Sequence, residues 1–319
     1  MKKVSVMMPA YNAEQFIGQA LESILSQDYE NLEIVVCDDA SKDRTPEIIA
    51  DYARRYPDRI KAILNQANLG VTKNCNLSLG HCDGDYVSLF AGDDVMLPTK
   101  IRKQVAALEA MPEAVMCYHP VEIFDSSTDK TMFLTNQTPR EDVQNFEDML
   151  LKGGIPGGCS IMVRSTAIPP GGYDESLKTV SDWLFFLEIS LQGNVIKVPD
   201  TLARYRKHAG GASQETYSLL EESLEALNVL VAKHPELSVK KDLIDNAKAR
   251  YIAGEAFRQL ERGDKRAYGL TQQVLALNSG AKYKLFNTAS WLVAHVPAAA
   301  PLVAFIARKA KFFIKRLAA

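Results

Sequence analysis

The sequence predicts an α/β protein with a mostly parallel sheet flanked by helices, followed by a helical C-terminal region. Two observations lead to this fold class. Short apolar runs alternate with helical patterns through the first ninety residues, which is typical of β–α–β units in a parallel sheet. Strand-like patterns then end near Tyr205, and only helical spacing follows. We therefore expect one domain over residues 1–215 and a helical region over residues 216–319.

Length and composition are those of a folded soluble protein. The 319 residues are 47% hydrophobic and 24% charged, with a formal net charge of −2. This near-neutral charge lacks the basic excess of a nucleic-acid-binding protein, so no nucleic-acid partner is expected. The five cysteines form no Cys-x-x-Cys pair, which argues against a disulfide framework or zinc ribbon and favours a reducing cytosol. The apolar run at residues 4–9 is too short for a signal peptide.

The elements of the first domain can be read in order. Strands are predicted at residues 4–8, 32–37, 60–64 and 86–90, where apolar residues run together. The first helix is predicted over residues 13–26, because Phe16, Ala20 and Ile24 recur at helical spacing. A second helix begins at Thr45-Pro46, with proline in its first turn. Another is predicted over residues 183–191.

The C-terminal region ends in a basic tail. Helical spacing is clear over residues 220–231, 243–260 and 267–277. No aspartate or glutamate follows Asp264, and lysines and arginines interleave with aromatic and aliphatic residues over residues 282–319. Such a basic amphipathic pattern favours peripheral contact with an anionic bilayer; a solvated basic face on a packed helix is the alternative. Pro297 and Pro301 interrupt the apolar run, and no stretch of about 18 apolar residues occurs, so no spanning helix is expected.

Polar residues follow three of the predicted strands. Pro9-Ala10-Tyr11-Asn12 ends the first, Asp38-Asp39 the second and Gly92-Asp93-Asp94 the fourth. Ligands of parallel sheets bind beyond the carboxyl ends of the strands. One acidic pair alone is usually a turn or cap, but four carboxylates at one edge would repel one another. A divalent cation, Mg²⁺ or Mn²⁺, would relieve that repulsion and could carry a diphosphate.

Further motifs continue this series along the chain. They are Asn68-Leu69-Gly70, Gly84-Asp85-Tyr86, Gly157-Gly158-Cys159-Ser160, Gly171-Gly172-Tyr173-Asp174-Glu175, Ser181-Asp182-Trp183 and Tyr205-Arg206-Lys207-His208. Each motif is weak alone, but the ordered series over residues 3–213 resembles family 2 glycosyltransferases of the bacterial polysaccharide type. The resemblance implies the Rossmann-like GT-A fold and an inverting transfer of sugar from a nucleotide-sugar donor.

The resemblance also implies a donor-binding site. Pro9, Ala10 and Tyr11 would line the nucleotide pocket, and Asp39 would bind the uracil of a UDP-sugar, with GDP and dTDP as open alternatives. Arg206 and His208 resemble a loop that closes over the diphosphate. Cys75 stands where the family often has arginine, and Lys73 is the candidate that could supply the missing charge to the donor.

The metal ligands follow from the acidic motif. The resemblance implies Mn²⁺ or Mg²⁺ bound by Asp94, with Asp93 near the ribose and His208 as a further ligand. Ala91 stands where the motif usually has its first acid. Which of the two remaining aspartates binds the metal and which contacts the ribose is therefore open, so Asp93 is also a candidate ligand.

Asp182 resembles the family's catalytic base, which removes the proton of the acceptor hydroxyl. Its alternative role is to cap the helix that follows. The predicted reaction is a single displacement onto a hydroxyl of a glycan or lipid-linked glycan, by a cytoplasmic protein held peripherally at the inner face of the cytoplasmic membrane. Two other functions remain open. One is an inactive nucleotide- or glycan-binding module, and the other is a sugar-phosphate nucleotidyltransferase, whose glycine-rich N-terminal loop is missing here.

Overall fold

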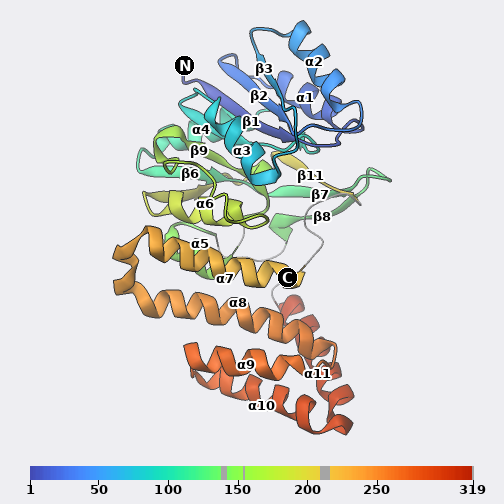
Figure 1. The fold of residues 1–319 in the computed structure, drawn as a ribbon, viewed down its shortest axis with the longest axis vertical. Coiled ribbons are helices and arrows are strands. Elements are labelled where there is room, and N and C mark those ends of the chain that lie inside the picture. The colour runs from blue at the N-terminus through green and yellow to red at the C-terminus, as the bar shows by residue number, and fades with distance from the viewer. Residues whose placement is uncertain (138–141, 154, 209–215, 318–319) are drawn as a thin grey trace. The chain divides into compact units, whose positions relative to one another are not determined.

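The computed structural model describes residues 1–137, 142–153, 155–208 and 216–317. The chain divides into two compact units, Met1–Ala212 and Ser213–Ala319 (Figure 1). The predicted boundary at residue 215 falls in the stretch 209–215, which lies outside the described residues. Each unit is described separately.

A seven-stranded sheet forms the centre of the N-terminal unit, in the order β10-β6-β9-β4-β1-β2-β3. Its strands are β1 (Val4–Ala10), β2 (Leu32–Asp38), β3 (Ile60–Leu64), β4 (Tyr86–Leu89), β6 (Ala114–Tyr118), β9 (Met162–Arg164) and β10 (Asn194–Lys197). β1 pairs in parallel with β2 and β4, whereas β9 is antiparallel to both of its neighbours. β1 and β2 are buried along almost their whole length, as their continuous apolar sequences require in a sheet covered on both faces. The predicted fold class is confirmed.

The helices of this unit join the strands of the sheet. They are α1 (Ile17–Leu25), α2 (Thr45–Arg55), α3 (Val71–Gly80), α4 (Lys100–Ala110), α5 (Phe146–Lys152) and α6 (Ser181–Ser190). α1 buries Ala20 and Ile24, as the predicted spacing requires, together with Ile17 and Leu21, whereas Phe16 precedes the helix. It begins four residues later than predicted, because the Ala13 carbonyl already accepts from the N–H groups of Phe16 and Ile17 in a preceding turn.

A second, four-stranded sheet was not predicted. Its order is β5-β11-β7-β8, with β5 (Val95–Met96), β7 (Val121–Asp125), β8 (Thr131–Leu134) and β11 (Ala203–Lys207). β11 is antiparallel to β5, pairing Ala203 with Met96, and parallel to β7. This pairing carries the end of β11 to the loop that follows β4, although more than a hundred residues separate them in sequence.

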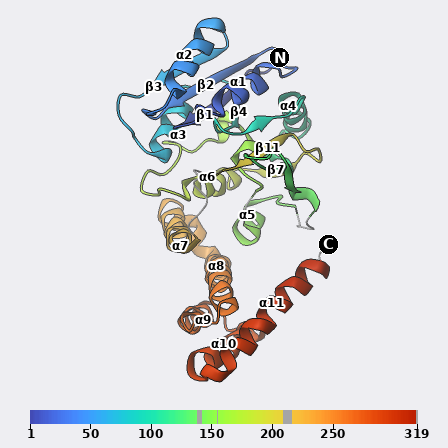
Figure 2. The ribbon, with the colours of Figure 1, turned by 90° about the vertical axis from the view of Figure 1, so that its right-hand side faces the viewer.

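The C-terminal unit is helical, as predicted. It contains α7 (Thr216–Lys233), α8 (Lys241–Glu261), α9 (Arg266–Leu277), α10 (Ala281–His295) and α11 (Ala300–Leu317), drawn in orange and red in Figure 2. One apolar cluster joins Leu220, Ile252 and Val274, and a second joins Leu260 and Val293. Among the described residues, no helix is long and apolar enough to cross a membrane. The side chains of residues 310–319, part of the predicted basic tail, lie outside the described residues.

Candidate active site

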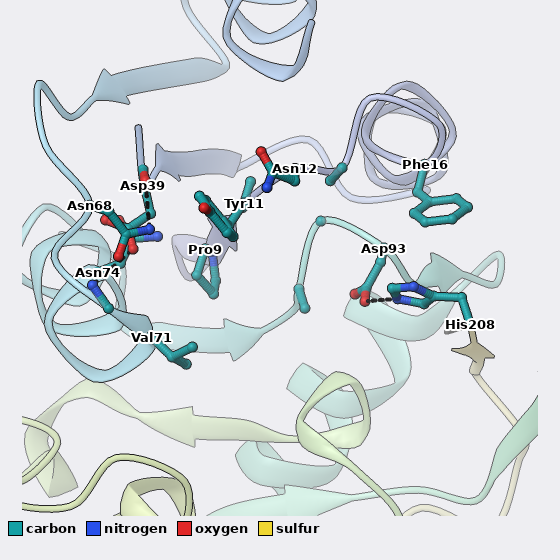
Figure 3. Close-up of a pocket in the computed structure, with 15 residues that line it drawn as sticks. Pro9, Tyr11, Asn12, Phe16, Asp39, Asn68, Val71, Asn74, Asp93 and His208 are labelled. Atoms are coloured by element: carbon teal, nitrogen blue, oxygen red, sulfur yellow. Dashed lines mark hydrogen bonds and ion pairs between the residues drawn. The ribbon is translucent and has the colours of Figure 1, made fainter. Parts of the chain in front are cut away.

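A cavity of about 310 Å³ opens where β1, β2 and β4 end (Figure 3). Its walls come from the loops that follow these strands, from the start of α3 and from the residue after β11. The lining residues are Pro9, Ala10, Tyr11, Asn12, Ala13, Phe16, Asp39, Asn68, Gly70, Val71, Asn74, Ala91, Gly92, Asp93 and His208. The cavity therefore lies at the edge of the sheet where parallel strands bind their ligands.

The loops after β1 and β2 are tied to each other. Asn12 and Ala40 both adopt left-handed backbone conformations, with φ of 47° and 56°, so each strand ends in a sharp turn. The Asn12 backbone N–H donates to Ser41 Oγ over 2.8 Å, and Asn12 Oδ1 accepts from the Lys42 N–H over 2.9 Å. Ser41 in turn donates its backbone N–H to Asp38. These bonds fix the cavity wall that is formed by the loops after β1 and β2.

Asp39 holds a third loop against this wall. Its Oδ1 accepts from the Leu69 N–H over 2.7 Å, and its Oδ2 accepts from the Gly70 N–H over 2.9 Å. The Asn65 side-chain amide donates to the same carboxylate, and the Asn68 amide donates to the Asp39 carbonyl. The side chain is 3% exposed and lines the cavity. Asp39 therefore orders the loop before α3 and presents a carboxylate to the cavity.

Gly92 lets the loop after β4 approach β1. A Cβ atom at this position would lie 2.8 Å from Ile17 Cδ1 and 3.2 Å from Ala10 Cβ. Both distances are below ordinary van der Waals contact. The next residue, Asp93, is thereby brought to the mouth of the cavity.

Asp93 and His208 form a pair at that mouth. His208 Nε2 lies 3.1 Å from Asp93 Oδ2, and the His208 ring packs 5.0 Å from the ring of Phe16. In Figure 3 this pair faces the cavity from the side opposite Asp39, with Pro9 and Tyr11 between them. Carboxylate and imidazole together can hold a divalent cation.

Asp94 and Arg206 lie behind this pair and do not line the cavity. Asp94 Oδ1 accepts from the Arg206 N–H over 2.9 Å, and burial, together with the neighbouring Asp93, raises the pKa of Asp94 to about 8. Arg206 donates from Nε to the Asp93 carbonyl over 2.7 Å. Its guanidinium lies 4.7 Å and 4.6 Å from the rings of Phe16 and Phe124. Both side chains therefore support the turn that carries Asp93.

Lys73 and Asp182 also lie outside the cavity lining. Lys73 Nζ is 4.0 Å from Glu175 Oε2 in an exposed ion pair. Asp182 is exposed in the first turn of α6, a helix that begins at Ser181 and has Val180 as its N-cap. Asp182 is therefore not the N-cap residue, but its carboxylate accepts the Trp183 N–H over 2.7 Å and so satisfies a donor in the first turn of α6.

A hydrogen-bonded contact fixes the start of α6 beside α3. Thr72 Oγ1 lies 3.1 Å from Ser181 Oγ, and it donates to the Leu177 carbonyl over 2.8 Å. Asp182 follows Ser181 directly. Its position is therefore next to α3, whose first residue, Val71, lines the cavity.

The four carboxylates at this edge are not unpaired as expected, although Asp93 still repels Asp94 and raises its pKa. Asp38, Asp39 and Asp94 each accept hydrogen bonds from backbone N–H groups. Within the described ranges, no cluster of three or more His, Cys, Asp or Glu side chains has the arrangement of a metal site. The Asp93–His208 pair still fits a cation of the Mg²⁺ or Mn²⁺ type, because such ions often take one or two protein ligands and complete their shell with substrate phosphates.

Several residues that line the cavity were not predicted from the sequence. Phe16 was expected on the buried face of a helix, but it precedes α1 and packs against His208 and Arg206. Asn74 lines the cavity from α3, where its amide donates to the Cys37 carbonyl over 3.0 Å. A polar residue on the buried side of a short helix was the available indication for Asn74. For Phe16, no feature of the sequence indicated that it would line the cavity.

Comparison with known proteins agrees with this arrangement. Residues 5–167, just over half of the chain, match the family model for glycosyl transferase family 2. An uncharacterized protein of Mycobacterium tuberculosis is 33% identical over 219 residues, which make up 67% of this chain and 62% of that protein. This chain thus spans less than two thirds of that relative. EpsE of Bacillus subtilis, whose name describes it as a glycosyltransferase, is 48% identical over 107 residues, 34% of this chain and 38% of EpsE.

Two solved structures share the fold. TarS 1–349 of S. aureus, crystallised with UDP-GlcNAc, matches with a TM-score of 0.60 at 16% identity, over 92% of this chain and 90% of that one. The mannosyltransferase PcManGT of Pyrobaculum calidifontis, solved with GDP-Man and Mn²⁺, gives 0.54 at 20% identity, over 95% and 87%. The predicted GT-A fold is confirmed, and the family match covers the strands and loops that build most of the cavity. The chain therefore belongs to glycosyl transferase family 2.

Proposed function

We propose that this protein transfers a sugar from a nucleotide-sugar donor to an acceptor hydroxyl, with inversion at the anomeric carbon. The observation that carries the proposal is the cavity that holds Asp39 on one side and the Asp93–His208 pair on the other. Membership of the family supports the reaction class, and TarS and PcManGT, which share the fold, were solved with nucleotide sugars.

The nucleotide end of the donor is assigned to the Asp39 side. Asp39 Oδ1 accepts from the Leu69 N–H and the Asn65 amide, whereas Oδ2 accepts from the Gly70 N–H and keeps a further lone pair. A ring N–H of the base can donate to it, which suits the uracil of a UDP-sugar; thymine and guanine also carry such a group. Pro9, Ala10 and Tyr11 would form the wall against which the base and ribose lie.

The diphosphate is assigned to the Asp93–His208 side. Here Asp93 and His208 would hold Mn²⁺ or Mg²⁺, with Asp94 directly behind them. A bound cation supplies Lewis-acid stabilisation of the charge that develops on the leaving diphosphate. Arg206 keeps the Asp93 turn in position through its bond to the Asp93 carbonyl. Lys73 is a cation on α3 that could reach the diphosphate after leaving Glu175.

Asp182 is proposed as the general base. Its position beside α3 is compatible with an acceptor that approaches past Val71. A carboxylate that removes the hydroxyl proton during attack contributes roughly 10²–10⁴ in rate. A single displacement from the opposite face of the sugar inverts the anomeric configuration and needs no covalent intermediate.

The acceptor is proposed to be a glycan or lipid-linked glycan at the inner face of the cytoplasmic membrane. Residues 282–319 would contact the anionic bilayer, as their basic and aromatic composition predicts. Leu285 and Trp291 on α10 are exposed, which agrees with such a contact.

A panel of UDP-, GDP- and dTDP-sugars, with and without Mn²⁺, tests the proposal by donor binding and by turnover. Asp182→Asn should lower kcat by about 10²- to 10⁴-fold while donor affinity is unchanged. Asp93→Asn should weaken donor binding only when Mn²⁺ is present. Asp200→Asn, which changes an exposed carboxylate paired with Lys103, is the matched control and should behave as the parent protein. Donor binding without turnover of any acceptor would instead indicate a binding module, and no nucleotide binding at all would refute the proposal.

A further inference from the structure

Helix α11 is apolar on two sides. One side belongs to the core of the C-terminal unit, where Ala307 packs in a cluster with Leu260 and Val293. The other side carries large apolar side chains that are 56–62% exposed and lie at i, i+3 and i+4 spacing. We call these residues the outer stripe: Leu302, Phe305 and Ile306. Figure 2 shows α11 at the margin of the helical unit, with one side directed away from α8, α9 and α10.

The outer stripe takes no part in the apolar core of the unit. The packed side of α11 already joins the cluster built on α8, α9 and α10. Leu285 and Trp291 on the preceding helix add further exposed apolar area, at 73% and 43% exposure. Large exposed apolar side chains that lie together on one helix face, as those of the outer stripe do, mark a surface that something else covers.

The charged residues of α10 and α11, the two helices that carry this surface, have one sign. Nine lysines and arginines follow Asp264, and no aspartate or glutamate does. Lys282 and Lys284 are exposed on α10, and Arg308 and Lys309 are exposed on α11 beside the outer stripe. A second copy of the chain would therefore bring like charges together across a two-fold interface. An anionic surface would meet them with opposite charge.

A cleft of about 560 Å³ borders the stripe and has the chemistry of an anion site. Three arginines line it with Glu261: Arg258, Arg262 and Arg308. Arg258 is paired with Glu255 over 2.7 Å, and Arg308 Nε donates to the Glu261 carbonyl over 2.9 Å. In the part of the chain that the structure describes, the Arg262 side chain and the terminal nitrogens of Arg308 have no hydrogen-bond or ion-pair partner.

These unpaired nitrogens suit a phosphate group. A guanidinium presents its donors in a planar fork that matches phosphate oxygens. Arg308 lies three residues after Phe305, about one helical turn, so the cleft and the outer stripe are neighbours on α11. A phosphate next to an apolar layer is the arrangement found at the surface of a phospholipid bilayer.

We propose that the outer stripe and the arginine cleft together dock onto an anionic phospholipid bilayer. The stripe enters the boundary between headgroups and acyl chains, and the cleft holds the phosphate of a lipid headgroup. The proposal rests on the membrane contact proposed above for residues 282–319. It adds a headgroup site whose residues Arg258 and Arg262 lie on and just after α8, outside that segment.

Co-sedimentation of the full chain with vesicles tests the proposal. Two compositions are compared: phosphatidylcholine alone, and a mixture in which about a third is phosphatidylglycerol, to which each interfacial arginine adds attraction. The parent protein should bind the anionic vesicles and bind neutral ones far more weakly. The double variant Phe305→Ser/Ile306→Ser should lose about tenfold in binding to anionic vesicles, because two apolar side chains no longer enter the interface. Val239→Ser, at an 87% exposed position of the same unit, is its matched control and should bind as the parent does.

The headgroup site is tested with Arg262→Ala/Arg308→Ala. Binding to anionic vesicles should fall by about fivefold per arginine, with no change on phosphatidylcholine. Arg250→Ala, an exposed arginine earlier on α8, is the matched control. Circular dichroism checks that each variant keeps its helical content. Equal binding by the arginine variant and the parent would overturn the headgroup site, and failure of the parent protein to bind anionic vesicles would overturn the whole proposal.

If a second protein molecule covered the outer stripe, the experiments would give a different result. If the stripe is an interface between copies, light scattering after gel filtration will find a dimer that Phe305→Ser/Ile306→Ser converts to a monomer, and the proposal is then wrong. Vesicle binding needs no donor and no turnover. A protein that binds anionic vesicles but transfers no sugar would contradict the proposed activity alone. An active enzyme that does not bind vesicles would contradict the docking surface alone.

Discussion

Replacing Asp39 by asparagine tests how the cavity is held together. The substitution keeps the shape of the side chain and removes its charge. In the parent protein the two carboxylate oxygens accept from the N–H groups of Leu69 and Gly70. An asparagine has only one oxygen, so in either orientation its amide group faces one of these donors, and that part-buried backbone N–H is left without its acceptor.

The cost of Asp39→Asn can be worked from these two bonds. A part-buried donor that loses its acceptor costs about 1 kcal/mol, the low end for an unsatisfied donor, and the bond that remains loses about 1 kcal/mol with its charge assistance. The sum of about 2 kcal/mol should raise the equilibrium constant for opening of the loop before α3 by roughly 30-fold. Donor affinity should fall as well, because the open loop no longer forms the cavity wall.

Hydrogen exchange followed by mass spectrometry measures this opening directly, in a peptide that spans Leu69 and Gly70. Asp38→Asn is the matched control, because Asp38 is equally buried and also accepts from two groups, the Ser41 N–H and the Ser41 hydroxyl. A hydroxyl can turn and accept from the new amide, so Asp38→Asn should leave the loop closed. Unchanged exchange in Asp39→Asn, or equal loosening in both variants, would refute the reasoning.

Three further predictions concern stability and the site. Gly92→Ala would bring a methyl group 2.8 Å from Ile17 Cδ1 and should lower the free energy of unfolding by about 1–3 kcal/mol in urea titrations, whereas Gly80→Ala, in open space, should not destabilise. Burial lowers the pKa of His119 to about 3, so the folded protein keeps this ring neutral while the unfolded chain takes up a proton below about pH 6.5. The free energy of unfolding should therefore fall as pH drops from 6.5 towards 3, by at most about 1.4 kcal/mol per pH unit, and less steeply in His119→Asn. A parallel decline in both proteins would contradict this assignment. Arg206→Lys removes the planar group that stacks between two rings and should weaken Mn²⁺-dependent donor binding by about tenfold in calorimetry; unchanged affinity would mean that Arg206 does not position the Asp93 turn.

The strands of the parallel sheet and the loops after them were predictable because their causes are local. A strand buried on both faces must be apolar along its length, and β1 and β2 follow that rule. Residues that end parallel strands must gather at one edge, which is why Tyr11, Asp39 and Asp93 all line the same cavity. The helical unit was predictable for the same reason, since its apolar spacing is repeated along each helix.

The second sheet was not predictable in this way. β5 has two residues and β11 has five, and each is stabilised by a partner far away in the sequence. Its pairing brings His208 to Asp93 and Arg206 to Asp94, contacts on which the shape of the cavity mouth depends. No local pattern encodes such a contact, because its energy comes from residues more than a hundred positions apart.

The sequence by itself thus determined the fold class, the edge of the sheet that carries the cavity and most of the polar residues around it. Only the tertiary structure decided which of them reach the cavity: Asp93 and His208 do, whereas Asp94 and Arg206 turn inward and support them. The same holds for the arginine cleft, whose residues come from α8 and α11. Periodicity and motif order reflect interactions between residues that are close in the sequence. The direction of a side chain is determined by hydrogen bonds and packing between distant segments.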